Sequence, residues 1–159
     1  MNPAARNQKV TLFIQCLVDA VRPLVGEAMV AVLERLGLSL ECPSDHTCCG
    51  QPAYNSGYTR EARAAARRFV EVFEGAGTIV SPSGSCVNMV RHHYPELFRE
   101  EPAWLERAQA IAARTFEFTE FLVDVLKVED LGAVRPGRVT YHDSCHLLRG
   151  LRVQEQPRR

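Results

Sequence analysis

The sequence lacks any hydrophobic run long enough to cross a membrane as a helix. Its longest stretch without a charged residue is 75–90, which contains a proline, an asparagine and three serines, whereas a spanning helix needs about 20 predominantly apolar residues. The first twenty residues also lack the basic start, the apolar run and the cleavage site of a secretory signal. The sequence therefore predicts a cytoplasmic protein.

The chain also lacks an excess of charge of either sign, since 19 Lys and Arg residues balance 19 Asp and Glu residues. Nucleic-acid binding depends on basic side chains that neutralise phosphates, so this balance argues against a nucleic-acid partner. The sequence contains no G-x-G-x-x-G fingerprint after a strand and no phosphate-binding loop. It contains no Ser-His-Asp or Cys-His arrangement at a meaningful spacing either. We therefore assign no catalytic residue and no hydride or hydrolytic chemistry to this chain.

Six cysteines are what the sequence does have in abundance. A chain of 159 residues with 46% hydrophobic content buries about 70% of its unfolded surface and folds around one core without disulfides. In a reducing compartment, grouped cysteines are more often metal ligands or redox groups than structural bridges. The cysteines are therefore candidates for chemistry.

Strand and helix patterns alternate along the first half of the chain. Strands are expected at 10–15, 38–42 and 78–81, where short apolar or β-branched runs occur. Helices are expected between them, at 23–36 after Pro23 and at 59–74 before Gly75. Because crossovers between parallel strands are short and right-handed, this β-α-β-α-β order predicts an α/β fold, a parallel sheet flanked by helices.

Three more helices are expected after the third strand. One runs from Cys86 toward Tyr94, the next opens at Pro102, and the last covers 118–126. The aromatic residues of this part, Trp104 among them, are expected to pack in the core because no basic groove accompanies them.

A weak internal repeat connects the two ends of the chain. Residues 139–145 repeat the Val, Thr and Cys positions of residues 10–16 at an offset of 129. In both places a strand-like run ends at the cysteine and a Leu-rich sequence follows. The same offset would place a second Cys-Cys-Gly beyond Arg159. We therefore expect a first cysteine-rich domain at 1–134 and the start of a truncated second repeat at 135–159, whose half-built sheet favours self-association.

Four cysteines are expected to meet at one edge of the sheet. Cys16, the Cys48–Cys49 pair and Cys86 each follow a predicted strand and precede a helix, and ligands of open α/β sheets gather at the carboxyl ends of the strands. Helix amino-termini at this edge favour the thiolate form. Gly50 after the pair permits a backbone turn that lets both thiols face one centre.

Several kinds of chemistry use thiols in this arrangement. A disulfide between the adjacent Cys48 and Cys49 would be a strained ring. Zinc sites usually draw on Cys-x-x-Cys or paired histidines, and no Cys-x-x-Cys occurs here. Iron-sulfur clusters accept thiolates that are scattered along a chain. The spacing favours an iron-sulfur cluster, and a non-enzymatic zinc-binding or thiol-based interaction module stays open as the alternative.

The spacing of these cysteines resembles the CCG, or cysteine-rich, domain family. That family has one cysteine, a long interval, Cys-Cys-Gly, a second interval of similar length and Cys-x-x-Cys. In this chain Cys16 is followed after thirty-one residues by Cys-Cys-Gly at 48–50, and after thirty-two more by Ser-Gly-Ser-Cys at 83–86. The strings CCGQPAYNSG at 48–57 and SPSGSC at 81–86 resemble the branch that comprises lactate utilization proteins and glycolate oxidase iron-sulfur subunits.

The resemblance implies a two-repeat oxidoreductase subunit that binds an iron-sulfur cluster of the 4Fe-4S type. It also implies electron transfer, together with partner subunits, in a system that oxidises L-lactate or glycolate. Carried over by position, the cluster ligands are Cys16, Cys48, Cys49 and Cys86. Ser83 stands where the family motif has a cysteine, which leaves four thiolates and puts a five-cysteine cluster type in doubt. We expect Cys145 to be an unligated thiol.

The remaining cysteine and the histidines lie outside this pattern. Cys42 is expected to be a small buried apolar residue at a strand end. His92 and His93 are expected on a helix surface, and His46 is a candidate for tuning the site. The polar residues at 51–55 either line the site or turn the chain.

Overall fold

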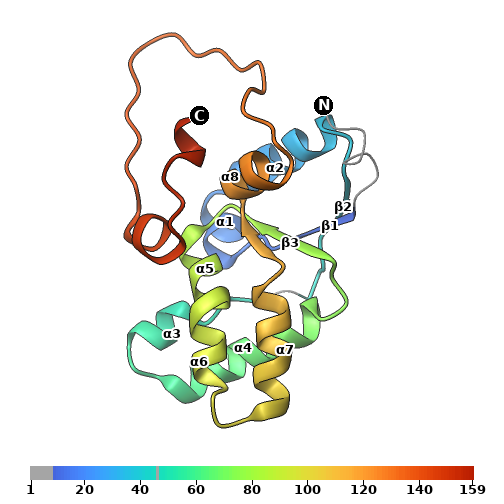
Figure 1. Ribbon diagram of the computed structural model, residues 1–159, viewed down its shortest axis with the longest axis vertical. Helices are drawn as coiled ribbons and strands as arrows, with labels where there is room; N and C mark the ends of the chain where they lie inside the picture. Colours follow the sequence, from blue (N-terminus) through green and yellow to red (C-terminus); the bar gives the residue numbers. More distant parts are fainter. Residues whose placement is uncertain (1–8, 46) are drawn as a thin grey trace.

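The computed structural model describes residues 9–45 and 47–159, in which four short strands form one parallel sheet (Figure 1). The strand order is β2-β1-β3-β4, and all three pairings are parallel. The inner strands are therefore β1 and β3, and the predicted α/β fold with a helix-flanked parallel sheet is confirmed. The strands are β1 (Lys9–Leu12), β2 (Ser39–Glu41), β3 (Thr78–Ser81) and β4 (Thr115–Glu117).

The sequence pattern predicted three of these strands and missed β4. The third predicted strand has the bounds of β3, whereas β1 ends at Leu12, three positions before its predicted end. β4 has only three residues, too few for a strand alternation to be recognised. It forms because its register pairs Phe116 with Val80 and because Thr115 is fully buried.

The helices connect these strands in the predicted order. Helix α2 starts with Pro23 at its first position and is followed by Gly37 at a φ of 82°, the two residues that favour a helix start and stop. The helices expected from Cys86 and at 118–126 are each broken by a π-helical turn. The helices are α1 (Cys16–Val21), α2 (Pro23–Arg35), α3 (Gln51–Asn55), α4 (Thr59–Phe73), α5 (Gly84–Asn88), η2 (Met89–His93), α6 (Tyr94–Leu97), α7 (Pro102–Ala112), α8 (Phe118–Glu120), η3 (Phe121–Val125), η4 (His146–Leu151) and η5 (Gln156–Arg158).

The sheet separates two hydrophobic clusters, because successive side chains of a strand point to opposite faces. Val10, Leu12 and Val80 face the cluster that includes α2 and η3. Ile79 and Phe13 face the other cluster, to which α4, α6 and α7 contribute. Figure 1 shows this layering, with α2 and α8 on one side of the sheet and α4, α6 and α7 on the other.

The last part of the chain leaves the body in a long irregular segment and returns to it. Residues 127–144 form no helix or strand, and Val139 is 79% exposed. The strand expected before Cys145 is therefore not formed, since an extended segment is stable only when it pairs with a neighbour. A helix does begin at Cys145, and η4 lies against α5. In the described ranges no helix is both long and apolar enough to span a bilayer.

Candidate cysteine site

The cysteines predicted as ligands follow the strands in the expected way. Cys16 is the first residue of α1, just after β1, and Cys86 lies in α5, just after β3. Cys48 and Cys49 precede α3 on the connection from β2 to α4. Because β1 and β3 are neighbouring inner strands, their carboxyl ends bring the loops that carry these cysteines to one edge of the sheet.

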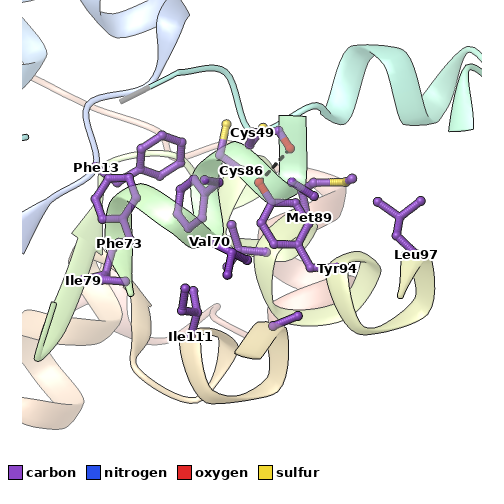
Figure 2. Close-up of a cluster of buried hydrophobic side chains, with 14 of the residues drawn as sticks. Phe13, Cys49, Val70, Phe73, Ile79, Cys86, Met89, Tyr94, Leu97 and Ile111 are labelled. Carbon is purple, nitrogen blue, oxygen red and sulfur yellow. Dashed lines mark hydrogen bonds between the residues drawn. The ribbon is translucent and has the colours of Figure 1, made fainter. Parts of the chain in front are cut away.

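The structure brings the four sulfur atoms together as two contacting pairs. The Cys16 thiol donates a hydrogen bond to Cys48, and the Cys49 thiol donates one to Cys86. The two pairs also lie near each other: a negative charge on Cys86 raises the pKa of Cys16, and a negative charge on Cys48 raises the pKa of Cys49. Figure 2 shows Cys49 and Cys86 at the border of the α4, α6 and α7 hydrophobic cluster.

The two pairs differ in their exposure to solvent. Cys49 is 1% exposed and Cys86 is 7% exposed, whereas Cys16 is exposed and Cys48 is half-buried. The Cys49–Cys86 pair therefore forms a buried floor, and the Cys16–Cys48 pair forms a rim that solvent reaches.

Hydrogen bonds concentrate thiolate character at Cys86. The hydrogen bond from Cys49, assisted by the hydroxyls of Ser83 and Ser85, lowers the pKa of Cys86 to about 7 despite its burial. The same hydrogen bond, together with burial, raises the pKa of Cys49 well above its usual range. Cys16 is exposed, yet the surrounding protein removes part of its hydration; this partial desolvation and then the hydrogen bond to Cys48 raise its pKa. The expectation that helix starts favour the thiolate is thus wrong for Cys16 and Cys49, because desolvation and neighbouring sulfurs dominate there.

Ser83 has a local role in this pattern. It stands at the position of the missing fifth cysteine and at the N-cap position of α5, where its side chain makes no capping hydrogen bond. Its hydroxyl lies 3.3 Å from that of Ser85. Both hydroxyls hydrogen-bond to Cys86. The serine therefore supplies a hydrogen-bond donor to a sulfur where the family pattern supplies another sulfur.

The backbone conformation and the close packing at position 50 explain why a glycine follows the two adjacent cysteines. Its φ is +82°, a backbone conformation that residues other than glycine rarely adopt. A Cβ atom at this position would also lie 3.0 Å from Ala65 Cβ and 3.1 Å from the Ala62 carbonyl oxygen of α4. The backbone N–H of Gly50 points back at Cys48 Sγ at 3.5 Å. The glycine therefore lets the cysteine pair turn tightly against α4.

Two buried hydrogen bonds hold the cysteine loops, and sequence reasoning missed both. The Tyr94 hydroxyl donates to the Cys49 carbonyl oxygen at 2.9 Å, as the dashed line in Figure 2 shows. The Ser81 hydroxyl donates to Gln15 Oε1 at 3.2 Å and joins the carboxyl ends of β1 and β3. Gln15 gave a usable signal, a polar side chain closing an apolar run, but Tyr94 gave none.

The other residues singled out in the sequence lie in different settings. Cys42 is exposed, which corrects the expectation of a buried residue: it follows the edge strand β2 and borders an open groove. Cys145 is also exposed. His92 is exposed, whereas His93 is partly buried and contacts Glu96 and Asn88. His46 lies outside the described residues.

The donor set fits an iron-sulfur cluster in its chemistry. Across residues 9–45 and 47–159, no three His, Cys, Asp or Glu side chains are grouped as ligands around a single metal ion. The cysteines are instead free thiols associated in two pairs, and the four come from three loops. Four cysteine thiolates are the usual ligands of iron-sulfur clusters.

The fold and the site define an α/β protein whose cysteine-bearing loops follow the carboxyl ends of a parallel sheet. Residues 10–91 match the family model of the cysteine-rich (CCG) domain, and the chain belongs to that family. The resemblance inferred from the sequence is thereby confirmed.

The chain is also similar to proteins that are named lactate utilization protein A. It is 54% identical over 149 residues to lactate utilization protein A of Bacillus licheniformis and of Bacillus cereus. It is equally similar to lactate utilization protein A 2 of Bacillus mycoides. The matched region covers 94% of this chain but only 62% of each relative, so the chain spans less than two thirds of their length.

Proposed function

We propose that this chain is the iron-sulfur-binding, electron-transferring component of a multi-protein system that oxidises L-lactate or glycolate. The observation that carries this proposal is the association of Cys16, Cys48, Cys49 and Cys86 in one place. The similarity to lactate utilization proteins supports the substrate class. A 4Fe-4S cluster held by these four thiolates would accept and release single electrons.

The surroundings of the four thiols suit a group that is buried on one side. Cys49 and Cys86 would hold it from the hydrophobic side, and Cys16 and Cys48 from the solvent side. Hydrogen bonds to ligand sulfurs tune the reduction potential of such centres. The hydroxyls of Ser83 and Ser85 already donate to Cys86, and they would stabilise its negative charge.

The chemistry of the substrate defines what partners must supply. Oxidation of a 2-hydroxy acid to a 2-oxo acid breaks one C–H and one O–H bond and releases two electrons and two protons. The sequence has no recognisable flavin or nicotinamide motif, so we assign the acceptor of that electron pair to a partner subunit. The exposed Cys16–Cys48 rim is the side from which such a partner would exchange electrons. We propose that the protein acts in the cytoplasm. We also propose that 1–134 form the first cysteine-rich domain and that 135–159 form the opening of a second repeat.

Anaerobic reconstitution with iron and sulfide tests the proposal. We expect about four irons and about four acid-labile sulfides per chain, with a brown colour. Cys48→Ser and Cys86→Ser are expected to lose the bound iron, and Cys42→Ser and Cys145→Ser serve as matched controls that keep it. Circular dichroism of all four variants checks that each one folds.

The opposite result identifies the alternative function. Binding of one zinc per chain without sulfide would contradict the cluster and would support the alternative function, a non-enzymatic zinc-binding or thiol-based interaction module. Retention of four irons in Cys86→Ser would show that the ligands are not those proposed.

A further inference from the structure

An open groove of about 540 Å³ runs along α2, between this helix and the residue Cys42 that follows the edge strand β2. It extends along α2 from Pro23 to Glu34, which is about 16 Å at a rise of about 1.5 Å per residue. Most of its lining is apolar and comes from Leu12, Ile14, Pro23, Val30 and Ala31. We call this feature the α2 groove.

The charged residues that line the α2 groove are all acidic. They are Asp19 of α1 and Glu27 and Glu34 of α2, and no described Lys or Arg residue lines it. The three residues are exposed, and within 9–45 and 47–159 none of their carboxylates forms an ion pair. Glu27 and Glu34 are seven positions apart, so they lie on the same side of α2, about two helical turns from each other. The α2 groove therefore combines an apolar lining with negative charge that the described residues do not neutralise.

We propose that the α2 groove docks a helical segment of a partner protein, one whose apolar side chains are flanked by lysines or arginines about two turns apart. Amphipathic helices bind other proteins by laying their apolar face into an apolar groove. The basic side chains of the segment would face the carboxylates of Asp19, Glu27 and Glu34, an arrangement that selects a partner by complementary charge. The length of the groove matches about eleven residues of a helix.

The negative charge of the α2 groove argues against other occupants. Its carboxylates would repel the headgroups of an anionic membrane and the phosphates of a nucleic acid. A second copy of this chain would have to present basic side chains that are not already paired. The arginines of the most basic helix, α4, form ion pairs with acidic residues of their own chain, and these arginines are Arg60, Arg63, Arg67 and Arg68.

One end of the α2 groove lies beside the exposed pair of cysteines. Asp19 follows Cys16 by three positions in α1, and residues three apart are neighbours on a helix surface. Cys42 also lines the groove, and partial desolvation and then the nearby Asp19 carboxylate raise the pKa of its thiol. A partner docked in the groove would therefore lie next to the Cys16–Cys48 rim. Docking itself does not depend on the proposed electron transfer through that rim.

Thiol labelling measures whether the α2 groove is occupied, because Cys42 lines it and is exposed. The probe is a synthetic helical peptide with leucines on one face, flanked by lysines two turns apart, and the control peptide carries glutamates in place of the lysines. Maleimide modification of the protein without iron is followed by mass spectrometry. We expect a saturating concentration of the lysine peptide to slow the reaction of Cys42 at least tenfold. The reaction of Cys145, which is exposed outside the groove, is expected to stay unchanged, and the glutamate peptide is expected to protect neither thiol.

Substitutions in the α2 groove separate its charge from its shape. Glu27→Gln combined with Glu34→Gln is expected to weaken binding of the lysine peptide about fivefold, as two exposed charge contacts would, and fluorescence anisotropy measures the affinity. Glu100→Gln combined with Glu106→Gln, at exposed positions outside the groove, is expected to leave the affinity unchanged. Ala31→Lys places a long basic side chain in the groove and is expected to weaken binding at least tenfold. Ala31 is exposed, so the fold is expected to persist, and circular dichroism checks it.

Three results would overturn the proposal. Equal protection of Cys42 by the two peptides would show that charge does not select the occupant. Unchanged affinity after substitution of Glu27 and Glu34 would place the peptide outside the α2 groove. Protection of Cys42 without any peptide, increasing with protein concentration, would make the groove a contact between copies of this chain. Because the protein contains no iron in these experiments, none of the results depends on the proposed cluster.

Discussion

Tyr94 and Cys49 are joined by a hydrogen bond of 2.9 Å from the tyrosine hydroxyl to the cysteine carbonyl oxygen. Tyr94 is fully buried and Cys49 is 1% exposed, so water does not replace this bond. It connects α6, on the far side of the hydrophobic cluster, with the turn that carries both adjacent cysteines. The position of the cysteine turn thus depends on the packing of the core beneath it.

Removal of the Tyr94 hydroxyl tests this connection. Tyr94→Phe leaves the Cys49 carbonyl oxygen buried without its partner, which is expected to lower the free energy of unfolding by about 1–3 kcal/mol. Urea denaturation of the protein without iron measures the change. Tyr54→Phe is the matched control, since the Tyr54 hydroxyl bonds to the exposed Glu96, and its effect is expected to stay below about 0.5 kcal/mol. Equal effects of the two substitutions would contradict the structural role of Tyr94.

Alanine substitutions at Gly50 and Gly57 separate the cost of backbone strain from the cost of steric overlap. Both have a φ near +80°, but a Cβ atom meets Ala65 and Ala62 at Gly50 and nothing within 4 Å at Gly57. Gly57→Ala is expected to cost about 1 kcal/mol from the left-handed conformation alone. Gly50→Ala is expected to cost more than about 2 kcal/mol, because α4 or the cysteine turn must shift. Denaturant unfolding measures both, and similar losses at the two sites would show that the turn has room.

The sequence predicted the parts of the fold that have strong local patterns. β3 and α4 combine an apolar run or a helical periodicity with clear turn residues, and their predicted positions agree with the structure. β4 was missed because its three residues are defined by pairing with β3 and not by their own pattern. The breaks at Met89 and Phe121 depend on packing, which no local pattern encodes.

The sequence predicted which cysteines meet at the candidate site, but it did not predict how deeply each is buried or which residues hold their loops in place. Strand ends and spacing were enough to expect Cys16, Cys48, Cys49 and Cys86 at one edge of the sheet. Their division into a buried pair and an exposed pair depends on how deeply each loop enters the core, which spacing does not report. Tyr94 lies 45 positions from Cys49 in the sequence, and the pattern around it indicates only a core tyrosine.

Glu117 gives a pH dependence with a definite sign. Burial at the end of β4 raises its pKa above the ordinary value of 4.5, although it accepts hydrogen bonds from the backbone of Thr119 and Glu120. Between pH 4.5 and the raised pKa the folded protein binds more protons than the unfolded chain, so stability falls as pH rises through this interval.

Glu117→Gln removes this titration and keeps the hydrogen-bond acceptor. We expect the unmodified protein to lose stability relative to Glu117→Gln as pH rises above 4.5. Urea midpoints of both proteins at several pH values between 4 and 8 measure the difference. Parallel midpoint curves would contradict a raised pKa at Glu117.

Gly150 tests whether η4 belongs to the folded body. A methyl group at this position would overlap Asn88 Oδ1, so Gly150→Ala is expected to detach η4 from α5. Hydrogen exchange of the amides at 146–153 measures detachment, and we expect at least tenfold faster exchange. Gly75→Ala is the control, because nothing lies within 4 Å of a Cβ atom there and its φ is ordinary. Unchanged exchange in Gly150→Ala would mean that η4 adjusts to the methyl group without leaving α5.

Alkylation before and after reconstitution separates ligand thiols from the rest. In the protein without iron, the exposed Cys16, Cys42 and Cys145 are expected to react with iodoacetamide faster than the buried Cys49, because reaction needs access to the thiolate. After reconstitution, Cys16 is expected to become protected while Cys42 and Cys145 keep their rates. Mass spectrometry of the digested protein measures all three positions in one sample. Cys16 is the decisive residue, since burial cannot explain its protection and coordination can. Continued modification of Cys16 in the iron-loaded protein, or protection of Cys145, would require a different ligand set.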